Sequence, residues 1–113
     1  MSFEFHSITA EFAVAPQLQP EHMQAAAQAG FKSVIINRPD HELDASQPQS
    51  DVMIQAAQAA GLAVQYQPVV SGSITWDNVE EFKQIYQTMP KPILAYCRSG
   101  ARCANLYQLA QQN

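Results

Sequence analysis

Two arginines and a glycine closely follow a cysteine near the carboxyl-terminal end of the chain. Within five positions, Cys97 is followed by Arg98, Gly100 and Arg102. The apolar residues 92–96 are typical of a short buried strand, and the residues after Arg102 are typical of a helix. A strand–loop–helix unit directs backbone N–H groups and the positive end of a helix into one concavity, which binds an anion and lowers the pKa of a thiol. We therefore expect Cys97 to be a nucleophile and the chain to be a cysteine-dependent enzyme.

The other residues of this loop have expected roles in substrate binding. Arg102 is expected to hold the anion with its guanidinium group, while backbone N–H groups are expected from Ser99, Gly100 and Ala101. The Arg98 side chain either contacts the anion or points to solvent at the site entrance. Cys103 has two interpretations. It is either a resolving thiol that attacks an oxidised or persulfidated Cys97, or a small residue on the buried face of the first helical turn.

The composition excludes several classes of protein. The chain has 113 residues, of which 47% are hydrophobic, and we expect residues 1–113 to form one domain. No apolar run approaches the length of a membrane span. The formal charge of −4 argues against nucleic acid as the main partner, because phosphate backbones require a basic face. Three arginines occur in the chain and two of them lie beside Cys97, so we expect a small anionic substrate.

The cysteine and histidine usage indicates a reducing compartment and no bound metal. Two cysteines six positions apart are not a disulfide framework. The first residues lack a basic region followed by an apolar one, so we expect no signal peptide, reduced thiols and a cytoplasmic location. The three histidines have no ligand spacing, and there is no Cys-x-x-Cys pair, so we expect neither a metal nor a cofactor.

The order of the expected elements predicts an α/β fold. Residues 3–15 are expected to form one or two strands at a sheet edge, and later strands are expected at 31–37, 62–66 and 92–96. Helices are expected to separate them, at 20–30, at 46–61 with a capping box of Ser46 and Gln49, and after Thr75. This alternation predicts a central, mostly parallel sheet flanked by helices. Ligands bind beyond the carboxyl ends of such strands, so we expect loops 37–46, 67–75 and 97–102 to converge on one site.

The loop after the strand at 31–37 carries several charges. Besides Arg38, four of its residues are charged or titratable near neutral pH: Asp40, His41, Glu42 and Asp44. His41 could carry protons, but the composition favours a solvated charged loop. Arg38 could either form a salt bridge within the loop or attract an anion.

Three motifs together resemble a known family. The loop Cys97-Arg-Ser-Gly-Ala-Arg102 resembles the active-site loops of cysteine-based phosphatases and of rhodanese sulfurtransferases. The stretch 30–39 resembles the dual-specificity phosphatase pattern of a glycine, a strand and Asn-x-Arg, and residues 67–70 resemble the strand end before the phosphatase acid loop. Residues 3–110 are thereby similar to the beta-lactamase hydrolase-like protein, phosphatase-like domain family. This resemblance implies a cysteine-phosphatase-like fold.

The chain departs from the phosphatase pattern in ways that favour sulfur chemistry. Four residues separate Cys97 from Arg102, whereas the phosphatase signature has five, so fewer N–H donors surround the site. Tyr96 replaces the usual histidine, Cys103 replaces a serine or threonine, and Ser71 occupies about the place of the general-acid aspartate. Without that acid, a phosphatase would lose ~10²–10⁴-fold in rate. Sulfur transfer from thiosulfate needs no acid, because sulfite leaves readily.

Three hypotheses follow from these residues. The first is a sulfurtransferase that forms a Cys97 persulfide from thiosulfate or a low-molecular-weight persulfide and passes the sulfur to an acceptor thiol. The second is a phosphatase that hydrolyses a phosphate ester through a cysteinyl phosphate, with Asp77 as the best substitute acid. The third is a non-catalytic anion-binding or redox-sensing module. The departures above favour the first hypothesis over the second.

Overall fold

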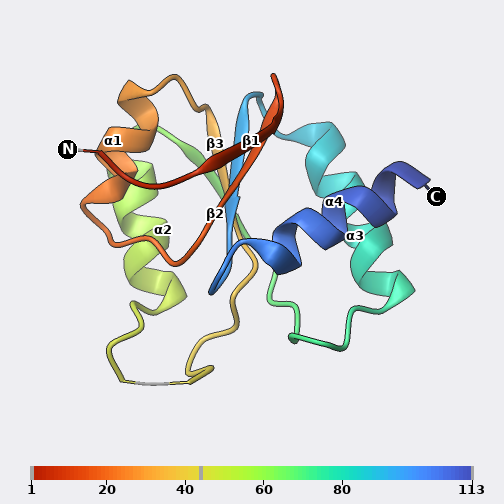
Figure 1. The fold of residues 1–113 in the computed structure, drawn as a ribbon. Helices are drawn as coiled ribbons and strands as arrows, with labels where there is room; N and C mark the ends of the chain where they lie inside the picture. Colours follow the sequence, from red (N-terminus) through yellow and green to blue (C-terminus); the bar gives the residue numbers. More distant parts are fainter. Residues whose placement is uncertain (1, 44, 113) are drawn as a thin grey trace.

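A five-stranded mixed sheet forms the centre of the molecule (Figure 1). The computed structural model describes residues 2–43 and 45–112. The strands are β1 (His6–Thr9), β2 (Phe12–Ala15), β3 (Ser33–Ile36), β4 (Ala63–Tyr66) and β5 (Ile93–Tyr96), in the spatial order β1-β2-β5-β3-β4. Strands β2, β5, β3 and β4 run parallel, and β1 pairs antiparallel with β2 at one edge. The predicted α/β class with a mostly parallel sheet is confirmed. Of the two amino-terminal strands, however, only β1 is an edge strand.

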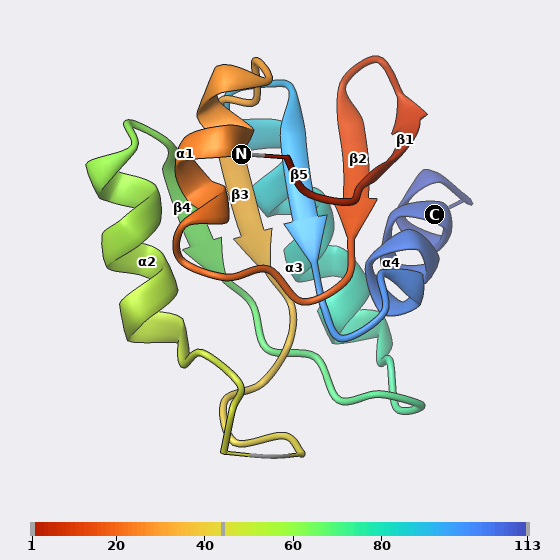
Figure 2. The ribbon, with the colours of Figure 1, turned by 60° about the vertical axis from the view of Figure 1, so that its left-hand side comes forward.

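Helices cover both faces of this sheet (Figures 1 and 2). Helices α1 (His22–Gln28) and α2 (Ser50–Ala59) lie on one face, and α3 (Trp76–Thr88) and α4 (Ala101–Gln112) lie on the other. Each face has its own buried cluster, because alternate residues of a strand point to opposite faces. Val34 and Leu94 belong to the cluster under α1 and α2, whereas Ile35 and Ile93 belong to the cluster under α3 and α4. No helix in the described part of the chain is long and apolar enough to span a membrane.

The helix starts show one correct and one wrong prediction. The Thr75 side chain accepts a hydrogen bond from the backbone N–H of Asn78 and forms a capping box, as expected at the start of α3. The predicted capping box at Ser46 is wrong, since α2 begins at Ser50. The Asp40 carboxylate takes the capping role instead, because it accepts bonds from the Ser50 N–H at 2.6 Å and the Ser50 hydroxyl at 2.7 Å. Loop 37–46 is thereby fixed to the start of α2.

The parallel strands end level with one another. Tyr96 of β5 is paired with Ala15 of β2 and with Ile36 of β3, and Ile36 is in turn paired with Tyr66 of β4. Cys97 follows directly after Tyr96, so it emerges at the middle of the carboxyl edge of the sheet. The sequence prediction that three loops meet at this edge can therefore be tested by the contacts of Cys97 and Arg102.

Candidate active site

Cys97 is held in the turn between β5 and α4. Its backbone N–H donates to the Ala15 carbonyl at 3.3 Å, which extends the pairing of β5 with β2 by one residue. Its Sγ accepts the backbone N–H of Gly100 at 3.1 Å. The side chain is buried. The loop therefore surrounds the sulfur with backbone donors, as the strand–loop–helix pattern predicts.

The surroundings of Cys97 favour the thiolate. A hydrogen bond from the Cys103 side chain is the largest cause. With the backbone N–H groups of Cys103, Gly100 and Ser99, it outweighs burial and lowers the pKa of Cys97 to about 5. Burial, followed by the neighbouring Cys97, raises the pKa of the Cys103 thiol well above its usual range. The pair thus has an ionised sulfur and a protonated one at neutral pH.

Gly100 allows the tight turn that brings these donors together. Its φ of +94° lies in the region that residues with a Cβ rarely adopt. A Cβ at this position would also lie 3.4 Å from the carbonyl carbon of Ala15. The adjacent Ala101 N–H donates to the Ser99 hydroxyl at 3.4 Å. The backbone conformation therefore favours glycine here, whereas a Cβ would make only ordinary van der Waals contact with β2.

Arg102 lies in the first turn of α4 and is held by two other loops. Its Nη1 donates to the Val69 carbonyl at 2.8 Å and lies 3.0 Å from Glu42 Oε2, and its Nη2 donates to Glu42 Oε1 at 3.1 Å. The Nε–H of Arg102 is buried and has no acceptor in the described part of the chain. Loops 37–46, 67–75 and 97–102 therefore do meet at one site.

Glu42 is part of this site, which the sequence interpretation of a solvated loop did not predict. Its Oε1 also accepts a bond from Arg38 Nε at 3.1 Å, and Arg38 is buried and donates through Nη1 to Gln17 Oε1. Burial works to raise the pKa of Glu42, but hydrogen bonds from Arg102 and Arg38 outweigh it and lower the pKa below 4.5. Asp40 was also expected to be a solvated residue of this loop, but its carboxylate caps α2 instead. Asp44 lies outside the described residues.

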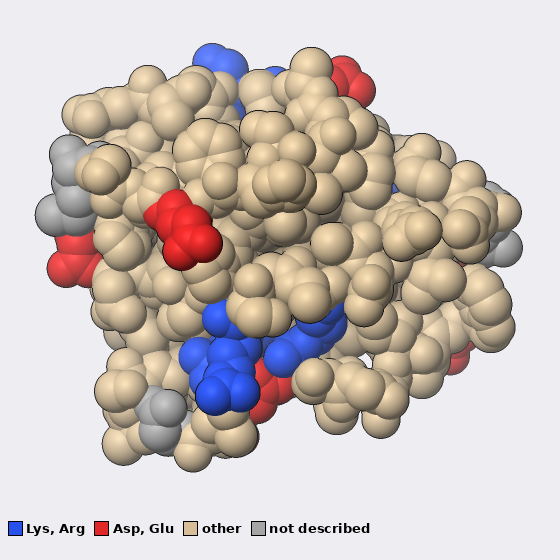
Figure 3. Space-filling view, viewed as in Figure 1, with Lys and Arg blue, Asp and Glu red and all other residues tan. Residues whose placement is uncertain are grey.

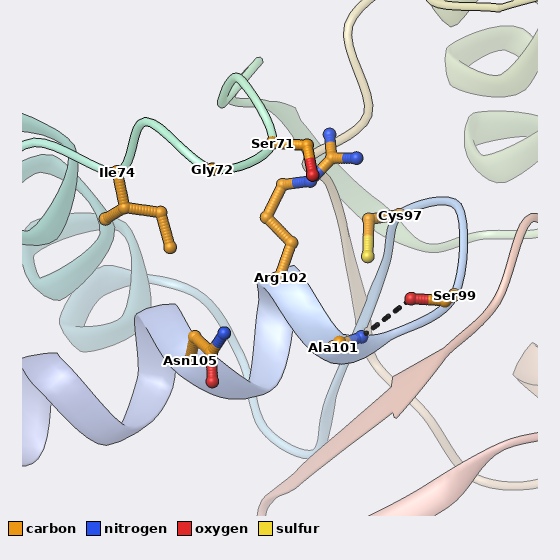
Figure 4. A pocket seen from close by; sticks show the side chains of 8 residues that line it. All are labelled: Ser71, Gly72, Ile74, Cys97, Ser99, Ala101, Arg102 and Asn105. Carbon is orange, nitrogen blue, oxygen red and sulfur yellow. Dashed lines mark hydrogen bonds between the residues drawn. The ribbon is translucent and has the colours of Figure 1, made fainter.

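A cavity of about 390 Å³ opens beside the sulfur. The β5–α4 turn and α4 form one wall through Cys97, Ser99, Ala101, Arg102 and Asn105. The loop before α3 forms the other wall through Ser71, Gly72 and Ile74 (Figure 4). Figure 3 shows basic side chains gathered around a hollow on one face of the molecule.

Several candidate residues lie elsewhere. The Arg98 side chain is exposed and does not line this cavity, and neither do His41 and Asp77. Among the described residues that line the cavity, none is an aspartate or a glutamate. Across residues 2–43 and 45–112, no cluster of three or more His, Cys, Asp or Glu side chains could hold a metal. The arrangement supplies a thiolate, backbone donors and a guanidinium group, which suit nucleophilic attack on a small anion.

The sequence analysis did not identify two of the groups that hold Arg102. The Val69 carbonyl is a backbone group, so its residue type gives no signal. Glu42 had a signal, because it lies four residues after Arg38 and the charges of such a pair attract. The sequence does not show, however, that Arg102, 60 positions further on, shares the same carboxylate. The pairing of distant charges depends on the register of the sheet.

A family model and a curated relative indicate the same family for this chain. The model of the family described as "Beta-lactamase hydrolase-like protein, phosphatase-like domain" matches residues 4–113. The Beta-lactamase hydrolase-like protein of Xylella fastidiosa (strain Temecula1) is 34% identical over 104 residues, which are 92% of this chain and 24% of that protein. The chain therefore spans about a quarter of the length of this curated relative.

Solved structures show the same fold. The crystal structure of nma1982 from Neisseria meningitidis Z2491 superposes with a TM-score of 0.86 at 34% identity, over 94% of this chain and 75% of that one. The core catalytic domain of the PP-IP phosphatase SIW14 from S. cerevisiae gives a TM-score of 0.64 at 17% identity, over 85% of this chain and 56% of that one. The second likeness concerns the fold alone. These findings favour phosphatase-type chemistry more directly than the sulfur transfer that the sequence favoured.

Proposed function

The chain belongs to the beta-lactamase hydrolase-like protein, phosphatase-like domain family, and on this basis we propose that it is a phosphatase-type cysteine enzyme acting on small phosphate monoesters. One observation carries the proposal: a thiol whose pKa is lowered to about 5 lines the same cavity as a guanidinium group fixed by a carboxylate. The cavity volume of about 390 Å³ suits a small molecule rather than a large one.

The geometry supports a two-step mechanism. The Cys97 thiolate attacks phosphorus, an S–P bond forms, and the ester P–O bond breaks as the alcohol oxygen leaves with the electron pair. Water then attacks the cysteinyl phosphate, and the S–P bond breaks to return the thiolate and release phosphate. Loop N–H groups and Arg102 stabilise the negative oxygens during both steps. An anion beside Cys97 would give the buried Nε–H of Arg102 the acceptor that it lacks.

The lining of the cavity limits the substrates. Because the described residues of this lining include no aspartate or glutamate, none of them offers a carboxylic acid to protonate a departing alkoxide. A missing general acid costs ~10²–10⁴-fold in rate. The preferred substrates are therefore phosphate monoesters whose leaving group is stable as an anion, such as aryl phosphates.

Sulfane-sulfur transfer is a second candidate, and two specific observations favour it. Four residues separate Cys97 from Arg102, and the cavity lining includes no acid among its described residues. In this reaction the thiolate attacks the outer sulfur of thiosulfate, a new S–S bond forms, and the original S–S bond breaks to release sulfite. An acceptor thiolate then takes the terminal sulfur as a persulfide and returns the Cys97 thiolate. Neither step requires a proton donor for a poor leaving group.

One paired experiment tests both candidates. The protein is assayed with p-nitrophenyl phosphate, with and without vanadate, and its intact mass is measured after incubation with thiosulfate. Turnover that vanadate blocks, and that is lost in Cys97→Ser and Arg102→Ala but kept in Lys32→Gln, supports the phosphatase. No turnover of p-nitrophenyl phosphate, together with a mass gain of one sulfur that is absent in Cys97→Ser, refutes it and supports sulfur transfer. If the protein shows neither turnover nor a sulfur adduct, both candidate functions are refuted.

A further inference from the structure

A second hollow lies against the cavity beside Cys97. It has a volume of about 340 Å³ and is lined by Glu42, Leu43, Val70, Ser71, Arg98 and Arg102. Ser71 and Arg102 line both hollows, so the two share a wall. The smaller hollow lies between loops 37–46, 67–75 and 97–102.

The charge at these hollows is positive although the protein is acidic. Among the described residues that line either hollow, the charged ones are Arg98, Arg102, Glu42 and the Cys97 thiolate. The Glu42 carboxylate is already shared by Arg102 and Arg38. All three arginines of a chain with a net charge of −4 are thus concentrated here. One carboxylate and one thiolate do not neutralise three guanidinium groups, so the site keeps a net positive charge, and Arg98 is the arginine that has no ion-pair partner among the described residues.

Arg98 supplies the uncommitted charge. Its side chain is exposed, and none of the ion pairs or side-chain hydrogen bonds between residues 2–43 and 45–112 involves it. Its backbone is fixed, because its carbonyl accepts the N–H of Gln17 at 3.2 Å. Leu43 and Val70 line the same hollow with side chains that are 58% and 61% exposed. A cation beside two exposed apolar side chains suits a ligand that carries a negative group on a short carbon chain.

We propose that this hollow is a second anionic subsite, in which Arg98 binds a negative group of a substrate whose reactive anion lies at Cys97. The substrate class is then a small molecule with two negative groups, joined by a short spacer that contacts Leu43 and Val70. This inference rests on the proposed function, because it takes the cavity beside Cys97 as the place of reaction. It adds a requirement on the substrate that phosphatase or sulfurtransferase chemistry alone does not impose.

Alkylation of Cys97 tests the subsite without turnover. The probes are iodoacetyl-glycine, iodoacetyl-β-alanine and iodoacetyl-γ-aminobutyrate, each compared with its primary amide, and alkylation is followed by intact mass. At one spacer length, the carboxylate is expected to react faster than its amide by up to roughly fivefold, which is the upper end of the range for an exposed ion pair. Arg98→Gln should reduce this ratio to about one, and Arg98→Lys should keep part of it.

Lys32→Gln is the matched control, because it removes one exposed positive charge at the opposite end of β3. It should leave the ratio unchanged. Equal rates for carboxylates and amides at every spacer length, or a ratio that survives in Arg98→Gln, would overturn the subsite. Alkylation requires only the thiolate, so a spacer-dependent ratio in a protein without phosphatase activity would leave the subsite standing while the proposed function fails.

Discussion

Two cysteines in contact together stabilise one negative charge. Cys97 carries the negative charge, and Cys103 beneath it keeps its proton and donates it toward the first sulfur. The sequence left Cys103 as either a resolving thiol or a small buried residue. The structure buries it completely and places it against Cys97. A serine or threonine hydroxyl at this position would donate in the same way, which explains why a cysteine can replace it.

The first prediction concerns this donor. In the unmodified protein, the rate of Cys97 alkylation by iodoacetamide should rise with pH through a midpoint near 5, because only the thiolate reacts. Cys103→Ala removes the largest stabilising contact and should raise the midpoint by about one unit or more, since a hydrogen bond to a charged group is worth about 1.5–3 kcal/mol. Rates measured by mass spectrometry from pH 4 to 9 give the midpoints.

Cys103→Ser is the matched control for this change. Its hydroxyl can still donate to the thiolate, so its midpoint should lie below that of Cys103→Ala. Equal midpoints in the alanine variant and the unmodified protein would show that the backbone N–H groups alone stabilise the thiolate.

At the scale of elements, loop 37–46 is the part that the sequence predicted least well. Its charges and proline indicate an exposed loop, and the sequence cannot show that Asp40 caps α2 or that Glu42 holds Arg102. The Asp40 contact lies within the connection from β3 to α2, whereas the contact between Glu42 and Arg102 depends on β3 and β5 lying side by side. By contrast, the β-branched strand β3 and the start of α3 at Thr75 depend on local sequence, and they were predicted. Local signals were sufficient for the elements but not for the contacts between loops.

The second prediction tests the role of this loop. Glu42→Gln leaves Arg38 and Arg102 without a shared counter-charge, so Arg102 should lose its fixed position. Turnover, or Cys97 adduct formation, should fall roughly 10- to 100-fold, because small displacements of a positioning group are costly. The free energy of unfolding should fall by about 1–3 kcal/mol at pH 7. Kinetics and urea unfolding measure the two effects.

The pH dependence separates this clamp from a general loss of packing. The folded pKa of Glu42 is lowered, so its ion pairs stabilise the fold above the unfolded pKa of about 4.5 and are lost as the pH falls through the lower folded value. The stability difference between the unmodified protein and Glu42→Gln should therefore shrink below about pH 4. Glu80→Gln, an exposed carboxylate on α3, should show no such difference. A stability loss in Glu42→Gln that persists at low pH would argue against the ion pairs as its cause.

On the scale of the whole molecule, the sheet explains why the site lies where it does. Two separate buried clusters hold helices to opposite faces, while four parallel strands end level with one another. The carboxyl edge is therefore a place where loops from both faces can meet without disturbing either core. The family resemblance and the alternation of strands and helices were sufficient to predict this architecture. The uneven charge, with a positive site on an acidic protein, follows from where the loops place three arginines.

The third prediction follows from this uneven charge. Because the net charge is −4 and the positive groups surround the site, a negative reagent is attracted locally but repelled by the rest of the surface. Raising the ionic strength from about 0.01 M to about 1 M shortens the Debye length from about 30 Å to about 3 Å, so distant repulsion should vanish first and local attraction last. As salt is added, the ratio of the alkylation rate with iodoacetate to that with neutral iodoacetamide should therefore first increase and then, at higher salt, decrease. Arg98→Gln should weaken the fall but keep the rise, whereas a ratio that only increases with salt would show that the arginines do not attract anions to Cys97.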